Sequence, residues 1–83
     1  MNKFQCTLGP LRLFIRETSD RNTFNVRVTA KPGNPFQQAL TIHAGTILGL
    51  EHRGKVVKFV KVKTFAPRLR YGKLIAGGLV VVE

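Results

Sequence analysis

Apolar and polar residues alternate along most of the chain, in short segments about ten residues apart. Because successive side chains of a strand point to opposite faces, this period of two predicts half-buried β-strands. Gly, Pro, Asn, Asp and Ser fill the intervals and predict turns at 9–10, 18–22, 31–35 and 52–54. The predicted strands are Lys3–Leu8, Leu11–Glu17, Thr23–Ala30, Leu40–His43, Thr46–Glu51, Lys55–Phe65 and Leu74–Val82.

A helical signal appears between residues 34 and 40, where Asn34 suits a cap and Pro35 the first helical position. It predicts at most one short helical turn near 35–40. The fold class is therefore all-β: a bent sheet of five to seven strands closed into an SH3-like or OB-like barrel, with a packed sandwich as the alternative. The predicted core comprises Leu11, Leu13, Ile15, Phe24, Val26, Val28, Leu40, Ile42, Ile47, Leu48, Val60, Val62 and Val80.

The chain has 83 residues, of which 43% are hydrophobic. That length predicts a single small domain spanning residues 1–83, and that composition predicts that it folds. Cys6 is the single cysteine, so an internal disulfide is excluded. The N-terminal residues lack the apolar run and cleavage site of a signal peptide, so we expect a cytoplasmic or virion-associated protein that is not secreted by that route.

The charge is strongly positive and unevenly distributed. Fourteen Lys and Arg against four Asp and Glu give a net charge of +10. Residues 1–51 carry six basic and three acidic groups, whereas residues 52–82 carry eight basic groups and no acid. So large an excess predicts an anionic partner.

Two predicted strands place aromatic rings between basic side chains. Arg12, Phe14 and Arg16 share one face of the second strand, opposite Leu11, Leu13 and Ile15. In the sixth strand, Val56, Lys58, Val60 and Val62 share one face, and the opposite face carries Lys55, Val57, Phe59, Lys61, Lys63 and Phe65. Basic groups follow phosphates while flat rings stack on unpaired bases, so this pattern favours single-stranded nucleic acid. The alternative is that Phe14 and Phe59 pack as a second apolar layer beneath solvated lysines.

A second candidate is the segment from Phe65 to Lys73, in which two arginines alternate with Leu69 and Tyr71. It is expected to be a basic loop or arm that contacts phosphates through Arg68, Arg70 and Lys73 and stacks a base on Tyr71. The alternative is a long hairpin connection whose Leu69 and Tyr71 close the end of the core.

Catalysis is not expected. His43 and His52 are the only histidines, and Ser19 and Cys6 are each the only residue of their kind, so a nucleophile, a base and an orienting acid would have to come from distant positions. The acids lie in or beside predicted turns or at the terminus, where solvation is expected. No metal site, cofactor or small-molecule substrate is predicted.

Residues Ala44–Phe59 (AGTILGLEHRGKVVKF) resemble the KOW motif of ribosomal and transcription-elongation proteins. The resemblance implies a small SH3-like barrel that contacts RNA, with His52, Arg53 and Lys55 at the RNA-facing loop. The chain length and the turn Lys31–Phe36 (KPGNPF) also look like the small single-stranded-DNA-binding proteins of filamentous phages. That likeness implies a dimer of OB-like barrels and a viral protein.

The function expected from the sequence is non-enzymatic binding of single-stranded DNA or RNA, in a homodimer or higher assembly and without a membrane. An apolar outer strand near Leu79–Val82 is the reason to expect that assembly. The alternative is a small structural or interaction subunit, such as a viral coat or decoration protein or an inhibitor of a host factor, whose basic surface faces nucleic acid or an acidic partner. The predicted binding residues are Arg12, Phe14, Arg16, Arg27, Arg53, Lys55, Phe59, Lys61, Lys63, Arg68, Arg70, Tyr71 and Lys73.

Overall fold

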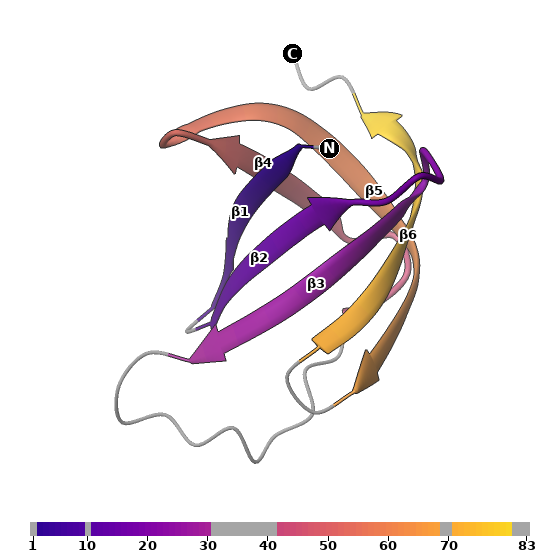
Figure 1. Cartoon of the computed structure of the whole chain (residues 1–83). Coiled ribbons are helices and arrows are strands. Elements are labelled where there is room, and N and C mark those ends of the chain that lie inside the picture. Colours follow the sequence, from indigo (N-terminus) through magenta and orange to yellow (C-terminus); the bar gives the residue numbers. More distant parts are fainter. Residues whose placement is uncertain (1, 10, 31–41, 69–70, 81–83) are drawn as a thin grey trace.

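Six antiparallel strands close into a barrel in the computed structural model, which describes residues 2–9, 11–30, 42–68 and 71–80, with the backbone alone at 30, 68, 79 and 80. The order around the barrel is β1-β2-β3-β6-β5-β4, and β4 returns to β1 (Figure 1). This confirms the predicted all-β barrel. The strands are β1 (Lys3–Leu8), β2 (Leu11–Glu17), β3 (Thr23–Ala30), β4 (Ile47–His52), β5 (Lys55–Arg68) and β6 (Tyr71–Val80).

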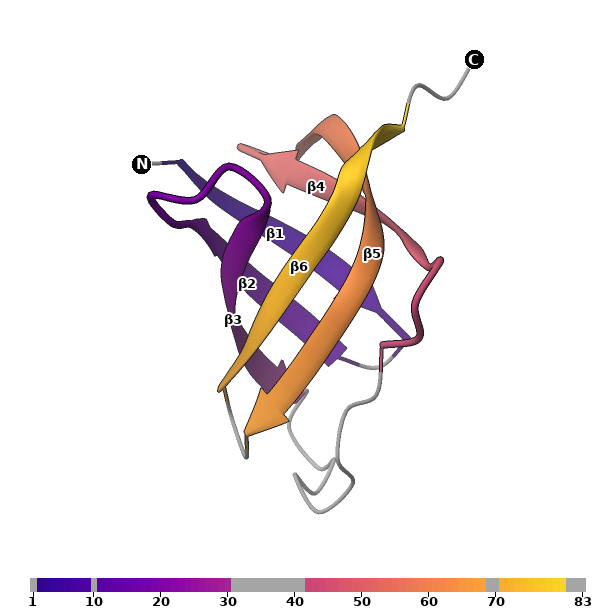
Figure 2. The ribbon, with the colours of Figure 1, turned by 90° about the vertical axis from the view of Figure 1, so that its right-hand side faces the viewer.

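The barrel is built from two meanders, β1-β2-β3 and β4-β5-β6, joined by the pairings of β3 with β6 and of β1 with β4. Figure 2 shows the long strands β5 and β6 crossing one side, with the first meander behind them. β6 lies between β3 and β5, but its pairing with β3 ends at Ile75, so among the described residues Leu79 and Val80 pair only with β5. Val81 and Val82 lie outside the described residues.

The first three strands have the predicted bounds, and the later ones differ at their ends. β4 begins and ends one residue later than predicted, β5 continues past Phe65 to Arg68, and β6 begins at Tyr71 instead of Leu74. The expected strand Leu40–His43 is not formed at Ile42 and His43, although Ile42 is buried. Its first two residues, and the predicted helical turn near 35–40, lie outside the described residues.

The turn between β4 and β5 has the backbone of a tight hairpin. His52 pairs with Lys55, and the two residues between them both have positive φ, 52° at Arg53 and 81° at Gly54. Two consecutive positive φ values are those of a type I′ turn, which matches the twist of the flanking strands. Asn or Gly would be the usual residue at the first position, so Arg53 holds a conformation that is strained for its type.

The core fills the barrel with one face of each strand. Nine of the predicted core residues are buried, and Leu11 is half-buried against them. Ile47 is 49% exposed, so its prediction was wrong: its neighbour Leu48 points inward, and adjacent strand residues face opposite ways. Leu40 and the side chain of Val80 lie outside the described part. Sequence reasoning missed five further buried hydrophobic residues: Phe4, Cys6, Leu50, Leu74 and Ala76.

Irregular pairing in β5 changes which side chains face the core. Register shifts leave Val57 without a partner in β4, and leave Lys63 and Gly77 unpaired between β5 and β6. Gly77 therefore lies in a bulge of β6. Because each extra residue reverses the alternation, Val56 is exposed and not on the inner face, and Phe65 packs against the core. Both differ from the faces predicted by strict alternation.

Candidate functional site

A row of polar and aromatic side chains crosses the outer face of five strands. Gln5 of β1 pairs with Glu51 of β4 on one side and with Phe14 of β2 on the other; Phe14 pairs with Arg27 of β3, and Arg27 with Tyr71 of β6. We call these five residues the aromatic row. Tyr71 is 62% exposed, and Phe14 is half-buried. The register thus brings together two aromatic rings that lie 57 positions apart in the sequence.

A second row runs beside the first, two residues further along each strand. Lys3 pairs with Arg16, Arg16 with Asn25, and Asn25 with Lys73. We call these four exposed residues the cationic row. Alternate residues of a strand are separated by two rises of about 3.4 Å, so the two rows are about 7 Å apart. That separation suits a nucleic-acid strand whose bases lie over one row and whose phosphates lie over the other.

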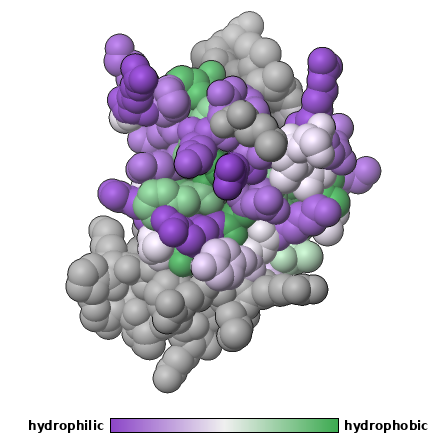
Figure 3. Space-filling model, in the orientation of Figure 1, coloured by the Kyte–Doolittle hydropathy of each residue, from purple (hydrophilic) through white to green (hydrophobic). Residues whose placement is uncertain are grey.

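The residues of both rows, apart from Lys73, line an open groove of about 780 Å³. Four cations and one carboxylate line it, so its charge is positive. Hydrophilic side chains cover most of the described surface over β1, β2 and β3, interrupted by small hydrophobic areas (Figure 3). We call it the basic groove; its lining residues are Lys3, Phe4, Gln5, Phe14, Ile15, Arg16, Asn25, Val26, Arg27, Glu51, His52, Arg53, Tyr71 and Gly72.

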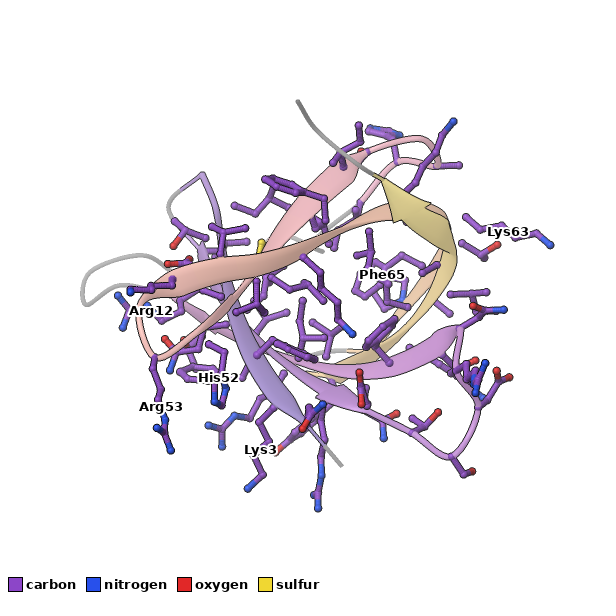
Figure 4. The ribbon with its side chains drawn as sticks, turned by 90° about the horizontal axis from the view of Figure 1, so that it is seen from above. Lys3, Arg12, His52, Arg53, Lys63 and Phe65 are labelled. Carbon is purple, nitrogen blue, oxygen red and sulfur yellow. The ribbon has the colours of Figure 1, made fainter. Side chains whose placement is uncertain are left out.

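The β4–β5 hairpin forms one wall of the basic groove. Its His52 Nδ1 lies 3.3 Å from the backbone oxygen of Lys3, and its ring meets Phe4 edge-on at 6.5 Å between centroids. These contacts hold the hairpin tip against β1. Arg53, at the tip, therefore extends the positive charge of the groove beyond the sheet (Figure 4).

The described acids outside the groove have partners. Glu17 accepts a hydrogen bond and ion pair from Lys58 Nζ at 2.8 Å, which lowers the pKa of Glu17. Asp20 accepts hydrogen bonds from the Asn22 backbone N–H and the Thr23 hydroxyl, and these lower the pKa of Asp20. Both carboxylates are therefore occupied with structural contacts at neutral pH.

Lys58 lies on the inner face of β5, as its position in the sequence predicted. Its Nζ is 4.6 Å from the centre of the Phe4 ring and 5.8 Å from that of Phe24. The Lys58 ammonium group is thus paired with Glu17 and lies near both rings. Lys58 is thus part of the fold and not of a free basic surface.

The predicted binding residues fall into two groups. Those of β2, β3 and β6 share one outer face. On this face Arg12 lies two residues from Phe14 of the aromatic row, and it pairs with Thr7 of β1 and with Thr29 of β3. Phe59, Lys61 and Lys63 lie on the outer face of β5, and Figure 4 shows Lys63 on the opposite side of the barrel from Lys3 and Arg53. Lys55 is exposed beside the hairpin turn. The structure therefore does not bring Lys61 and Lys63 to the basic groove.

The basic segment from Phe65 to Lys73 is not a long loop or arm. Phe65 pairs with Leu74, and Arg68 with Tyr71, so β5 and β6 continue to a short connection at 69–70. Phe65 points into the barrel (Figure 4). Tyr71 is exposed and does not close the core. The side chain of Arg68, and both Leu69 and Arg70, lie outside what the structure describes.

Nine groove residues were absent from the sequence-based set, among them Lys3, Gln5, Asn25 and Glu51. Lys3 and Gln5 alternate with the buried residues Phe4 and Cys6, so strand alternation was enough to place them on the outer face. Asn25 likewise follows the buried Phe24 and faces outward. Glu51 gave no such signal, because only the closure of the barrel brings it beside Gln5.

Other kinds of site receive no support from the described residues. Over those ranges, no group of three or more His, Cys, Asp or Glu side chains lies together in a way that could hold a metal ion. Burial and the nearby charge of Glu51 raise the pKa of the Cys6 thiol. Within the same part of the chain, no helix is long and apolar enough to cross a membrane.

No family model matches the chain, and comparison with curated proteins and with solved structures gives no significant match.

Proposed function

We propose that this protein binds single-stranded nucleic acid in the basic groove. The observation that carries the proposal is the side-by-side placement of the aromatic row and the cationic row. Unpaired bases gain from stacking on aromatic rings and on guanidinium planes, whereas phosphates gain from nearby Lys and Arg. A strand that crosses β1, β2, β3 and β6 would meet both kinds of group along its length.

The strained backbone of Arg53 supports the same proposal. A φ of 52° is disfavoured for residues other than Gly or Asn, yet an arginine occupies this position of the turn. Strain held in this way is frequent where a side chain has a role in binding. Arg53 lines the groove, and in this proposal it contacts a phosphate of the bound strand.

Fluorescence anisotropy with labelled single-stranded DNA, single-stranded RNA and duplex, each at several salt concentrations, tests the proposal. Four phosphate contacts predict a slope of log affinity against log salt concentration of about −3 for a single strand. Because stacking does not release counterions, a preference for the single strand should persist at salt concentrations that weaken duplex binding. Equal and steeply salt-dependent binding of all three would contradict the proposal.

A pair of charge-matched variants locates the binding surface. Arg16→Ala removes a cation from the cationic row, and Lys63→Ala removes one from the far side of the barrel. We expect Arg16→Ala to flatten the salt slope by about 0.7 and Lys63→Ala to leave it nearly unchanged. Equal flattening by both would indicate attraction by net charge alone.

A second candidate function rests on the outer face of β4 and β5. Ile47 is 49% and Val56 is 51% exposed, and Phe59 packs beside Val56 over Gly49. Exposed apolar side chains next to Lys61 favour a contact with an acidic partner protein or a second subunit. Light scattering tests the second subunit: a particle of twice the chain mass that Ile47→Asp converts to a monomer would support it, and a monomer at all concentrations would exclude it.

A further inference from the structure

We infer that Glu51 makes the basic groove selective for bases that present an amino group, so that cytosine is bound more tightly than thymine or uracil. This rests on the proposed function, since it assigns a base preference to the same groove. The groove holds one carboxylate, Glu51, among four cations where phosphates would be expected to bind.

Glu51 stands apart from the other acids that the structure describes. Glu17 is paired with Lys58, and Asp20 is held within its own turn. For Glu51, no cation within salt-bridge distance and no side-chain hydrogen bond is found among residues 2–9, 11–30, 42–68 and 71–80. Its carboxylate is half-buried at the groove and retains its capacity to accept hydrogen bonds from a ligand.

The backbone holds Glu51 at a defined place. Its pairing with Gln5 is the contact through which β4 closes the barrel onto β1, and the register shift between Leu50 and Glu51 lies immediately before it. Bulges of this kind redirect side chains and are frequent beside binding sites. Glu51 is therefore positioned by the barrel itself and not by a loop.

The position of Glu51 in the aromatic row determines which part of a bound nucleotide its carboxylate would contact. It lies two strands from Phe14, with Gln5 between them, so a base stacked near Phe14 would turn an edge toward the carboxylate and the amide. A carboxylate accepts hydrogen bonds from the N4 amino group of cytosine. Thymine and uracil present two carbonyl oxygens beside a single N–H, and those oxygens repel a carboxylate. Gln5 donates and accepts, so it tolerates either edge.

The test measures affinity for labelled 12-nucleotide oligo(dC) and oligo(dT) at pH 7.5 and fixed salt, with wild type, Glu51→Gln and Glu17→Gln. Wild type should bind oligo(dC) at least about fivefold more tightly than oligo(dT). Glu51→Gln removes a charge that repels phosphates and gains an amide donor, so its affinity for oligo(dT) should rise about threefold while the preference for oligo(dC) largely disappears. Glu17→Gln makes the same charge change outside the groove and should keep the preference.

The outcomes separate this inference from the function on which it rests. Equal affinity of wild type for the two oligonucleotides, together with a retained preference for single strands over duplex, would overturn the role of Glu51 alone. A Glu51→Gln variant that strengthens binding to both oligonucleotides by the same factor would also overturn it, because the carboxylate would then act only as a charge. Failure to bind either single strand would overturn both.

Discussion

The guanidinium carbon of Arg27 lies 4.9 Å from the centre of the Phe14 ring on the neighbouring strand, where the two residues are cross-strand partners. This is a cation–π contact, and it holds a planar cation over an aromatic ring on the outside of the barrel. Nucleobases stack on guanidinium planes as well as on rings. The pair therefore offers one layered platform within the aromatic row.

Arg27→Lys separates the planarity of this platform from its charge. Lysine keeps the positive charge but lacks the flat group that stacks on Phe14 and on a base. We expect a severalfold loss of affinity for single strands with an unchanged salt slope, measured by anisotropy titrations at several salt concentrations. Arg27→Ala should lower both the affinity and the slope. If lysine fully replaced arginine, the guanidinium would have no stacking role.

Leu50 and Ile47 test the two faces of β4. Leu50 is fully buried, whereas Ile47 is 49% exposed. Leu50→Ala should lower the free energy of unfolding by about 2–5 kcal/mol, because it leaves a cavity in the core. Ile47→Ala should change it by less than about 1 kcal/mol. Urea denaturation checks both, and similar losses for the two variants would contradict the assigned faces.

The Phe65 ring of the neighbouring strand β5 leaves no room for a side chain at Gly72. A Cβ added there would lie 2.5 Å from two ring atoms of Phe65, which packs against the core. Gly72→Ala should therefore displace the ring and destabilise the protein by about 1–3 kcal/mol. The control is Gly77→Ala, where the nearest atom would be at 3.6 Å. Thermal unfolding should show a clear decrease in Tm for the first variant and little change for the second.

Acid should weaken the Glu17–Lys58 contact in a defined pH range. The folded-state pKa of Glu17 is lowered, first by its hydrogen bond from Lys58, below the unfolded value of about 4.3. Its contribution to stability is thus fully present above that value and is lost as the pH falls through the lower folded pKa. Asp20, whose pKa is also lowered, acts in the same direction.

Lys58→Met isolates that effect, since methionine keeps the apolar stem between Phe4 and Phe24 but has no charge. Urea unfolding measured from pH 6 to pH 3 should show a smaller loss of stability for this variant than for wild type. The same loss in both proteins would show that the ion pair contributes nothing to acid sensitivity.

The sequence was sufficient for the fold class and for β1 to β3, because their alternation is uninterrupted and their turns carry Gly, Asp or Asn. It failed where the pairing is irregular. The extra residues Val57 and Lys63 reverse the faces of β5, and a bulge depends on the partner strand, which a local pattern does not contain. Val56 and Phe65 were therefore placed on the wrong faces.

The candidate site was only partly accessible from the sequence for a related reason. Alternation identified Arg12, Phe14 and Arg16 as outward-facing, but it did not show which residues lie beside them. Neighbours across strands depend on the register, which brings Tyr71 and Glu51 into the row of Phe14 and leaves Lys63 on another face. The charge and the aromatic content of the sequence thus predicted a class of ligand, whereas the strand register of the barrel determines which residues share one surface.

The most direct test of the proposed groove is to titrate ¹⁵N-labelled protein with a single-stranded 12-nucleotide oligonucleotide and to follow the backbone amide shifts by NMR. We predict that the largest shifts map to Lys3, Gln5, Phe14, Arg16, Arg27, Arg53 and Tyr71, while Ile47, Lys61 and Lys63 change little. Shifts centred on the outer face of β4 and β5, or spread evenly over all basic residues, would contradict binding in the basic groove.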